Sequence, residues 1–415
     1  MSDNRKITLI VNYYGMQAGG VETSFAELML YAVSKGYRVI WLTTENCLKN
    51  ATHTEITSCD AIEKSLIKSP THAAYVDRVS CRNERVIVIS CEPLTFARAE
   101  SMRGKLGEAS FENYLILPNF RGKIYFPEQF FTGGKKDRVL RQMASAVRKM
   151  NDADCLRGFA IQHLTAYEQN YGLTIKDKEK KLLGGLRRIT EPEKSTVTKN
   201  AADRGKRFEI TACSRFDFPH KGFILGLIRE FAVLKEKYPQ LSLTLIGDGA
   251  GMDRVKRLLE ELPRQTAEAV RLTGTLPLDR VRELFRHSQL NVGLSGALLD
   301  GASCCVPSVV VRHFCEDCEA YGFLSDVPDR LSEKPGGDVK PIIEAVIRMS
   351  DEEYIKQAYR DYECAKKVFD YRPDYLFEQN VKQSAVLSKS EIFRLRMLKA
   401  EISLKGRFRD IDDFA

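Results

Sequence analysis

The sequence predicts an α/β protein with two domains, each built around a doubly wound parallel sheet. Its 415 residues exceed what one hydrophobic core comfortably holds, so two domains of about 150–200 residues are expected. Short apolar runs typical of buried parallel strands alternate with amphipathic stretches typical of helices. Glycine-rich turns follow several of these runs, at the carboxyl ends of strands where open α/β sheets bind ligands.

The composition indicates a folded globular protein. Hydrophobic residues make up 43% of the chain and charged residues 29%, unlike a disordered sequence. No apolar run approaches the ~18–20 residues of a spanning helix and no signal-peptide pattern is present, so we expect a cytoplasmic protein. The 11 cysteines are scattered, which suits reduced thiols. The net charge of +8 suits a membrane surface, nucleic acid or a phosphorylated substrate, or is simply a solvated basic surface.

The first domain opens with a strand–helix–strand unit. Residues 7–11 are an apolar run, and a loop containing Gly19 and Gly20 follows. A helix is expected from Val21 to the stop at Gly36, and the second strand at residues 39–42.

Three more strands and a basic helix complete the first domain. The strands are expected at residues 85–89, 114–118 and 123–126. Residues 135–150 predict an amphipathic helix whose polar face is rich in Lys and Arg. That face is either a solvated surface over a core stripe or a patch for anionic lipid headgroups.

A change in composition separates the two domains. Residues 174–207 are rich in Lys, Arg, Glu and Thr, which suits an interdomain linker or an exposed hairpin. We place the first domain at residues 1–185 and the linker at 186–207.

The second domain, residues 208–370, repeats the alternation of strands and helices, and a charged tail follows at 371–415. Its strands are expected at residues 208–213, 241–246, 270–273, 290–293 and 308–311. Its helices are expected at residues 222–237, 251–262, 278–287, 297–304, 340–348 and 351–368. The tail alternates basic and apolar residues and contains a candidate terminal helix.

A candidate anion site lies in this second domain. Arg215 and Lys221 flank a turn after the first strand, and a paired Arg and Lys neutralise a phosphate group. Glycines after later strands, from Gly247 to Gly249 and from Gly293 to Gly296, would expose backbone amides to the same anion. The alternatives are that the two cations are surface charges and that Asp248 only turns the chain. The pattern predicts a site for a phosphate-bearing ligand.

Five segments in order give the chain a family resemblance. They are Gly19-Gly20-Val21-Glu22, Arg215 with Lys221-Gly222, Glu230-Phe231 through Ile246-Gly247-Asp248-Gly249, Thr273 through Pro277, and Leu299-Asp300-Gly301-Ala302 through Val309. Together they resemble the retaining glycosyltransferases of the GT-B fold, family 4 type, across roughly residues 7–370. The resemblance implies two Rossmann-like domains facing a cleft, with the tail packing back on the first domain.

The resemblance also implies a role for each candidate site residue. Arg215 and Lys221 would stabilise the departing diphosphate, helped by the backbone amides of Ser295, Gly296 and Ala297.

The remaining candidates would contact other parts of the donor. Asp300 would accept hydrogen bonds from the ribose, or would only interact favourably with a helix dipole. The other donor-binding candidates are Thr275 and Leu276 at the base, Gly19 and Gly20 at the diphosphate or acceptor, and Asp248 and Gly249.

Three departures from the family pattern concern the sugar. The family often has a second acid eight positions before the one at Asp300, but Val292 stands there, in a predicted strand. The turn from Arg215 to Lys221 is one residue longer than the common form, and Cys91 through Pro93 stand where the family often has a histidine. Recognition of the donor sugar is therefore less predictable than binding of the nucleotide.

No metal or cofactor is expected. Residues 313–318 contain one His and two Cys, but a structural zinc site needs four ligands in two spaced pairs, and Cys304-Cys305 is a poor second pair. The resemblance implies a metal-independent enzyme whose nucleotide-sugar donor is a substrate.

We therefore expect a retaining glycosyltransferase that moves a sugar from UDP or GDP to a saccharide or lipid-linked acceptor, in polysaccharide or lipopolysaccharide assembly. Its place would be the cytoplasm or the inner face of the cell membrane, with no nucleic-acid partner. The alternatives are another GT-B enzyme, such as a nucleotide-sugar epimerase, and a non-catalytic binding or scaffold protein. A hydride-transferring dehydrogenase is disfavoured because Gly19-Gly20 lacks the three-glycine fingerprint.

Overall fold

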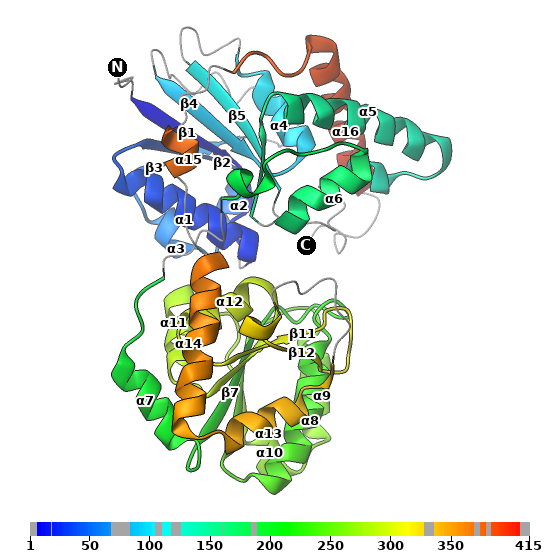
Figure 1. Ribbon diagram of the computed structural model, residues 1–415. Coiled ribbons are helices and arrows are strands. Elements are labelled where there is room, and N and C mark those ends of the chain that lie inside the picture. The colour runs from blue at the N-terminus through cyan, green and yellow to red at the C-terminus, as the bar shows by residue number, and fades with distance from the viewer. Residues whose placement is uncertain are drawn as a thin grey trace. The chain divides into compact units, whose positions relative to one another are not determined.

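The chain forms two compact units, each with its own sheet (Figure 1). Unit 1 comprises Met1–Arg187 and Asp370–Ala415, and unit 2 comprises Arg188–Phe369. The computed structural model describes residues 6–17, 19–67, 84–103, 110–117, 126–159, 161–183, 189–327, 336–368, 374–378 and 383–406. Of the expected strand at 123–126, only Phe126 lies within these ranges.

The described part of unit 1 contains a six-stranded parallel sheet in the order β3-β2-β1-β4-β5-β6. Its strands are β1 (Ile7–Asn12), β2 (Arg38–Thr43), β3 (Ile62–Leu66), β4 (Arg85–Ser90), β5 (Ser110–Leu117) and β6 (Leu156–Gly158). The order reverses between β1 and β4, so their carboxyl ends form the switch point where such sheets bind ligands.

Most helices of unit 1 bury apolar residues, whereas the short helix Glu45–Lys49 buries none of its residues. The helices of this unit are α1 (Gly20–Ser34), α2 (Glu45–Lys49), α3 (Thr54–Thr57), α4 (Pro93–Glu100), α5 (Gly133–Asp152), α6 (Ile161–Tyr171), α15 (Asp374–Glu378) and α16 (Lys389–Gly406). In α1, Phe25, Leu28, Met29 and Ala32 are fully buried at helical spacing. The chain leaves α1 through Gly36, whose φ is +75°, as expected for a glycine that ends a helix.

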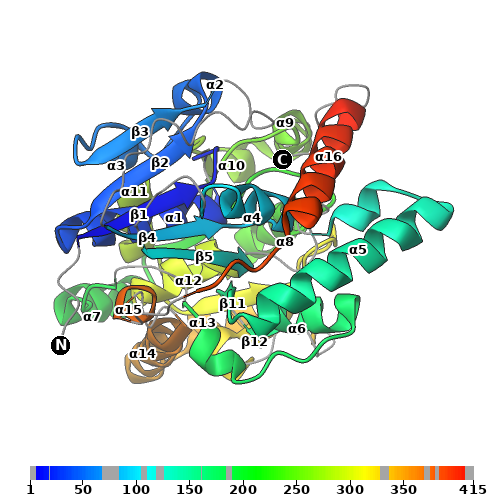
Figure 2. The same cartoon turned by 90° about the horizontal axis from the view of Figure 1, so that it is seen from above.

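The basic helix predicted from the sequence is α5, and it lies beside α16 (Figure 2). Lys135 pairs with Glu401, and Lys149 pairs with Glu391 at 2.7 Å. The start of α5, at Lys135, pairs with the later residue of α16, and the end of α5, at Lys149, pairs with the earlier one, so the two helices run antiparallel. Within the described residues, no helix is both long and apolar enough to cross a membrane.

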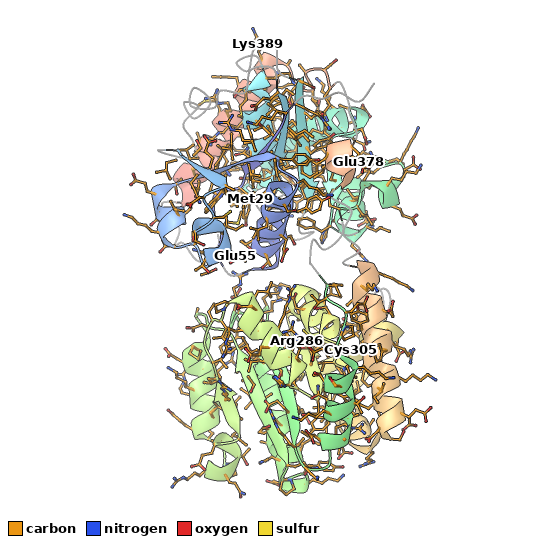
Figure 3. The ribbon with its side chains drawn as sticks, turned by 90° about the vertical axis from the view of Figure 1, so that its left-hand side faces the viewer. Met29, Glu55, Arg286, Cys305, Glu378 and Lys389 are labelled. Atoms are coloured by element: carbon orange, nitrogen blue, oxygen red, sulfur yellow. The ribbon has the colours of Figure 1, made fainter. Side chains whose placement is uncertain are left out.

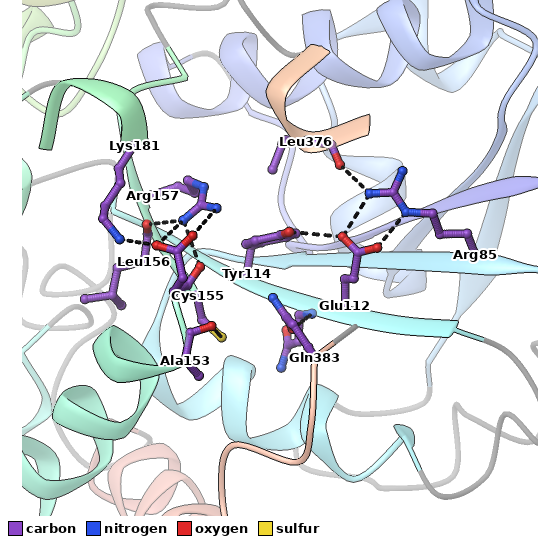
Figure 4. Close-up of polar contacts among 12 residues, drawn as sticks. Arg85, Glu112, Tyr114, Ala153, Cys155, Leu156, Arg157, Lys181, Leu376 and Gln383 are labelled. Carbon is purple, nitrogen blue, oxygen red and sulfur yellow. Dashed lines mark hydrogen bonds and ion pairs between the residues drawn. The ribbon is translucent and has the colours of Figure 1, made fainter. Parts of the chain in front are cut away.

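The C-terminal tail is tied into unit 1 by buried charge (Figure 4). Arg85 donates two hydrogen bonds to the carboxylate of Glu112, at 2.6 and 3.0 Å, and both side chains are buried. Arg85 also donates to the carbonyl oxygens of Leu376 and Phe377, both in α15. The side-chain oxygen of Gln383 accepts from the backbone amide of Asn113, at 2.8 Å. The tail therefore completes the polar contacts of β4 and β5.

The region predicted as a linker contains a helix. Helix α7 (Lys194–Asp203) belongs to unit 2, and it buries Val197, Asn200 and Ala201. The prediction of a linker over 186–207 is wrong for this stretch, because three spaced buried residues suffice to pack a largely polar helix.

The described part of unit 2 contains a seven-stranded sheet in the order β13-β12-β11-β10-β7-β8-β9. Its strands are β7 (Phe208–Cys213), β8 (Leu241–Ile246), β9 (Val270–Leu272), β10 (Leu290–Gly293), β11 (Ser308–Val311), β12 (Glu319–Phe323) and β13 (Gly337–Asp338). The strands from β7 to β11 are parallel, whereas β12 and β13 add to one edge in the antiparallel sense, which the sequence did not predict.

Most of the other helices of unit 2 lie close to their predicted ranges, whereas the short helix Arg264–Ala267 was not predicted. These other helices are α8 (Phe223–Lys237), α9 (Met252–Glu260), α10 (Arg264–Ala267), α11 (Leu278–Arg286), α12 (Ser295–Ser303), α13 (Lys340–Arg348) and α14 (Asp351–Val368). Each unit has its own packed interior, in which Met29 of unit 1 and Cys305 of unit 2 are buried (Figure 3).

Candidate functional site

The candidate site of unit 2 lies at the carboxyl ends of β7, β8 and β10. Because β7 pairs with β10 on one side and β8 on the other, the loops that follow these strands are neighbours. They are the loop after Cys213, the loop after Ile246 and the turn into α12 at Ser295. Open α/β sheets bind ligands at this edge.

Arg215 and Lys221 lie close enough for their charges to interact. Lys221 is partly buried, and burial, together with the cation of Arg215, lowers the pKa of its ammonium group to about 8. The turn between them is tight, because the Lys221 amide donates to the Asp217 carbonyl oxygen at 2.7 Å. Within the described ranges, neither cation forms a hydrogen bond or an ion pair with another side chain. Asp217, in the same turn, partly offsets this shift by raising the pKa of Lys221. Two adjacent cations are a favourable place for a dianionic ligand.

Glycines after β8 hold the Arg215 loop in place. A Cβ at Gly247 would lie 1.9 Å from the Ser214 carbonyl oxygen, and one at Gly249 would lie 2.8 Å from that of Phe216. Both glycines have a positive φ, +137° and +153°. The sequence predicted Gly249 at the donor; the structure adds that it lets two loop backbones pack together and so positions Arg215.

Asp248 bonds to its own turn. Its carboxylate accepts a hydrogen bond from the Gly249 amide at 2.7 Å, and the side chain is exposed. This contact is the chain-turning role considered as the alternative to ligand binding.

The start of α12 presents backbone amides. Ser295 has φ +56°, and no side chain caps the helix at Leu294. The first amides of a helix have no acceptor within it, so those of Ser295, Gly296 and Ala297 are suited to an anion. The helix is held rigidly, because the side-chain amide of Asn291 donates to the Leu298 carbonyl oxygen at 3.0 Å.

Asp300 is buried near the same cations. It is 5% exposed, and its carboxylate lies 3.6 Å from the guanidinium of Arg282 in α11. The pKa of the Cys213 thiol is raised to about 12, by burial first and then by Asp300, while Lys221 acts in the opposite direction. Asp300 and Lys221 are therefore both close to Cys213 at the end of β7. Sequence reasoning missed Arg282, because nothing in its local pattern distinguishes it from other helix-surface arginines.

The base-binding turn predicted at Thr275 and Leu276 follows β9. Gly274 has φ +68°, and its carbonyl oxygen accepts from the Gly247 amide at 2.9 Å, which ties this turn to the β8 loop. Leu276 packs against a small buried cluster around Ile246. Among the described residues, the amides of Thr275 and Leu276 donate no hydrogen bond, so both remain suited to a ligand.

Val292, at the position of the family's first acid, is fully buried within β10. The strand continues directly into α12, so the loop that carries the family's first acid is absent from this described part of unit 2.

The predicted glycines of unit 1 lie at its own switch point, after β1. A Cβ at Gly20 would meet nothing within 4 Å, whereas one at Gly19 would meet the carboxylate of Glu22. Glu92, at the start of α4, pairs with Lys399 of α16 at 2.6 Å. The tail thus places a cation at this edge, which the sequence pattern did not reveal.

Two further features of the molecule bear on ligands. A pocket of about 260 Å³ is lined by strand residues such as Glu209, Thr211, Ser242 and Thr244, away from the carboxyl ends of the strands. We assign the ligand to the carboxyl edge, because the cations and free amides lie there. Across the described ranges, no group of three or more His, Cys, Asp or Glu side chains is placed to hold a metal ion.

Comparisons with known proteins support the fold. No protein-family model matches the sequence, and a comparison with curated proteins finds no match. The structure of HepE from Anabaena in complex with UDP has a TM-score of 0.55 at 16% identity, and covers 96% of this chain and 100% of its own. HepE in complex with UDP-glucose has a TM-score of 0.54 at 16% identity, covering 96% and 99%. A glycosyltransferase from Rickettsia africae has a TM-score of 0.57 at 13% identity, covering 97% and 100%. The predicted fold class is therefore confirmed: the chain has the two-domain α/β fold of these GT-B glycosyltransferases.

Proposed function

We propose that this protein is a retaining glycosyltransferase that transfers a sugar from a UDP- or GDP-sugar to a saccharide or lipid-linked acceptor. The observation that carries the proposal is the pair Arg215 and Lys221, two cations whose charges interact beside the amino end of α12. HepE, a structural neighbour, binds UDP and UDP-glucose. A saccharide acceptor in polysaccharide or lipopolysaccharide assembly remains the expectation from the sequence.

The site residues support a reaction driven by charge stabilisation. As the bond from the sugar to the diphosphate breaks, negative charge grows on the leaving phosphate oxygen, where Arg215, Lys221 and the amides of α12 would stabilise it. The acceptor hydroxyl would pass its proton to that phosphate while it attacks on the same face of the sugar. Two protein cations would supply the charge that a metal ion supplies elsewhere, so we propose that transfer is metal-independent.

Thermal stabilisation by nucleotides tests the proposal. UDP, GDP and ADP are added to the purified protein, and one of them is expected to raise the melting temperature, since saturation at about 100 Kd stabilises by about 2.7 kcal/mol. Arg215→Ala should abolish the rise, whereas Arg264→Ala, which removes an exposed cation paired with Glu268, should not.

Product analysis then separates the alternative functions. A labelled sugar appearing on an added acceptor supports transfer. Conversion of the free nucleotide sugar without acceptor indicates an epimerase, and nucleotide binding without any turnover indicates a binding protein. If no nucleotide stabilises the protein, the proposal is wrong.

We also propose that unit 1 contacts an anionic membrane surface through α5 and α16. The exposed residues of α5 include Arg138, Arg141 and Arg148, and the neighbouring α16 exposes Phe393 and Met397, which lie on one helical face. Co-sedimentation with phosphatidylserine vesicles should fall with added salt and with Arg138→Glu. Equal sedimentation with neutral vesicles would contradict this.

A further inference from the structure

Three aromatic rings cluster beside the cationic pair of unit 2. The ring centroids of His220 and Phe314 are 4.6 Å apart, those of His313 and Phe314 are 5.3 Å apart, and those of the two histidines are 6.3 Å apart. His220 comes from the turn between Arg215 and Lys221, and the other two rings come from the loop after β11. Contacting rings at these distances form a continuous aromatic surface, which we call the ring cluster.

The ring cluster is close to Arg215 and Lys221. The pKa of the His220 imidazole is lowered to about 4, by burial first and then by the cation of Lys221, although Asp217 raises it in part. His313 and Arg215 also contribute to the lowering. His220 is therefore uncharged at neutral pH. It behaves as a flat, largely apolar ring and adds no charge to the cationic pair.

The loop that carries Phe314 is fixed to its surroundings. The Phe314 amide donates to the His220 carbonyl oxygen at 3.0 Å. Glu316 accepts two hydrogen bonds from Arg254 of α9, at 2.6 and 2.5 Å. Two glycines on α8 allow this loop to lie against the helix, because a Cβ at Gly222 or Gly226 would lie 2.6 or 2.2 Å from loop backbone atoms. The loop is therefore a rigid support rather than a free tether.

Phe314 is held in an unfavourable conformation that exposes its ring. Its φ is +55°, a region that residues other than Gly, Asn and Asp rarely occupy. Its side chain is nevertheless 52% exposed, so core burial does not compensate for the strain. Strain of this kind, fixed by surrounding contacts, commonly marks ligand sites.

Strand order places the ring cluster at the sugar end of a bound donor. The predicted base-binding turn follows β9, the cationic pair follows β7, and Phe314 follows β11. In the sheet, β9 lies on one side of β7 and β11 on the other. A nucleotide sugar laid across this edge, with its base at Thr275 and its diphosphate at Lys221, therefore extends its sugar toward the ring cluster. The family's first acid, which would contact the sugar, is replaced here by the buried Val292.

We propose that His220, His313 and Phe314 form a sugar-binding platform on which the apolar face of the donor's hexose ring stacks. The inference rests on the proposed function and adds how this chain recognises the sugar without the family's acidic loop. Phe314 supplies the exposed face, and the two histidine rings support its edge. The chemistry required is a pyranose ring with a face of axial C–H groups.

The test compares a nucleotide with the same nucleotide carrying glucose. Affinities of Phe314→Ala are measured for UDP and UDP-glucose, or for GDP and GDP-glucose if GDP is the stabilising nucleotide. Loss of a stacking contact should weaken binding of the nucleotide sugar by about 3- to 10-fold, while binding of the bare nucleotide changes less than about 2-fold. Phe314→Tyr should retain the affinity for the nucleotide sugar. The matched control is Val233→Ala, which removes an exposed apolar side chain of α8.

Each outcome decides between distinct conclusions. The first case is that Phe314→Ala melts at the same temperature as the unsubstituted protein. If it then binds the nucleotide and the nucleotide sugar with equally reduced affinity, or with unchanged affinity, the platform is wrong although the proposed function stands. If Phe314→Ala is unstable, His313→Ala is measured in its place, and an unchanged preference for the nucleotide sugar overturns the platform. If no nucleoside diphosphate binds the unsubstituted protein, the proposed function fails and the platform with it.

Discussion

At the scale of single residues, the candidate site depends on two adjacent positive charges. Lys221 is partly buried next to Arg215, and its pKa is lowered from 10.5 to about 8. The folded pKa lies below the unfolded value, so Lys221 destabilises the fold below pH 8. That cost is relieved as the pH rises from about 8 to 10.5. A bound diphosphate would offset the same cost by stabilising the charged form.

The nucleotide affinity should therefore depend on pH through Lys221. Above pH 8 the free protein loses the Lys221 proton and must regain it on binding, so affinity should fall by up to about tenfold per pH unit. Calorimetry at pH 8.5 in two buffers of different ionisation enthalpy should show proton uptake. Lys221→Arg, whose cation does not titrate in this range, should bind with a flat pH profile. An unchanged slope in Lys221→Arg would assign the titration to another group.

At the scale of elements, glycines decide how closely loops pack on helices. Gly226 lies on the face of α8 that the loop around Cys318 covers, and an added Cβ would lie 2.2 Å from the Cys318 amide nitrogen. Because the obstacle is backbone, the loop itself must move. The same loop carries His313 and Phe314 of the ring cluster. Packing of this loop on α8 is therefore coupled to the proposed recognition of the sugar.

Gly226→Ala should destabilise unit 2 by about 1–3 kcal/mol, as overpacking does elsewhere. Denaturant unfolding should show a lower midpoint with an unchanged slope. Gly205→Ala is the matched control, because a Cβ there meets nothing within 4 Å. Comparable losses in the two variants would mean that the close approach at Gly226 does not set the cost.

At the scale of the whole molecule, the chain leaves unit 1, forms unit 2 and returns. Arg85 of β4 holds the returning segment by its hydrogen bonds to the carbonyl oxygens of Leu376 and Phe377, while Glu112 neutralises it. The two side chains are 6% and 0% exposed, so removing one leaves a buried charge without its partner. The integrity of unit 1 therefore depends on residues nearly three hundred positions apart.

Arg85→Ala should cost unit 1 about 3–5 kcal/mol and make the tail sensitive to proteases. The transition of unit 2 should not move, since Glu112, Leu376 and Phe377, to which Arg85 donates, belong to unit 1.

Arg38→Ala removes a partly exposed cation that pairs with Glu63 at 2.9 Å and with Glu84 at 3.7 Å, so it should cost less than about 1 kcal/mol. If both variants lose the same stability, burial does not govern the value of these pairs.

The local sequence pattern determined most of the elements and part of the site. Helices 340–348 and 351–368 were predicted with the bounds that the structure has, because their apolar spacing and flanking residues are local signals. Arg215 and Lys221 could be paired in advance because only one short turn separates them. The edge strands β12 and β13 and the helix α7 had weak local patterns and were missed or misassigned.

Tertiary structure alone decided which distant residues meet. Three contacts join residues from different elements of the chain. They are the pairing of Arg282 with Asp300, the packing of the Cys318 loop on Gly226, and the hydrogen bond from Arg85 to Phe377 in the tail. Periodicity reports which face of an element is buried, but it carries no information about the partner on that face. Those contacts follow from the order of strands in each sheet, which is set by the summed packing of the whole unit and not by any one segment.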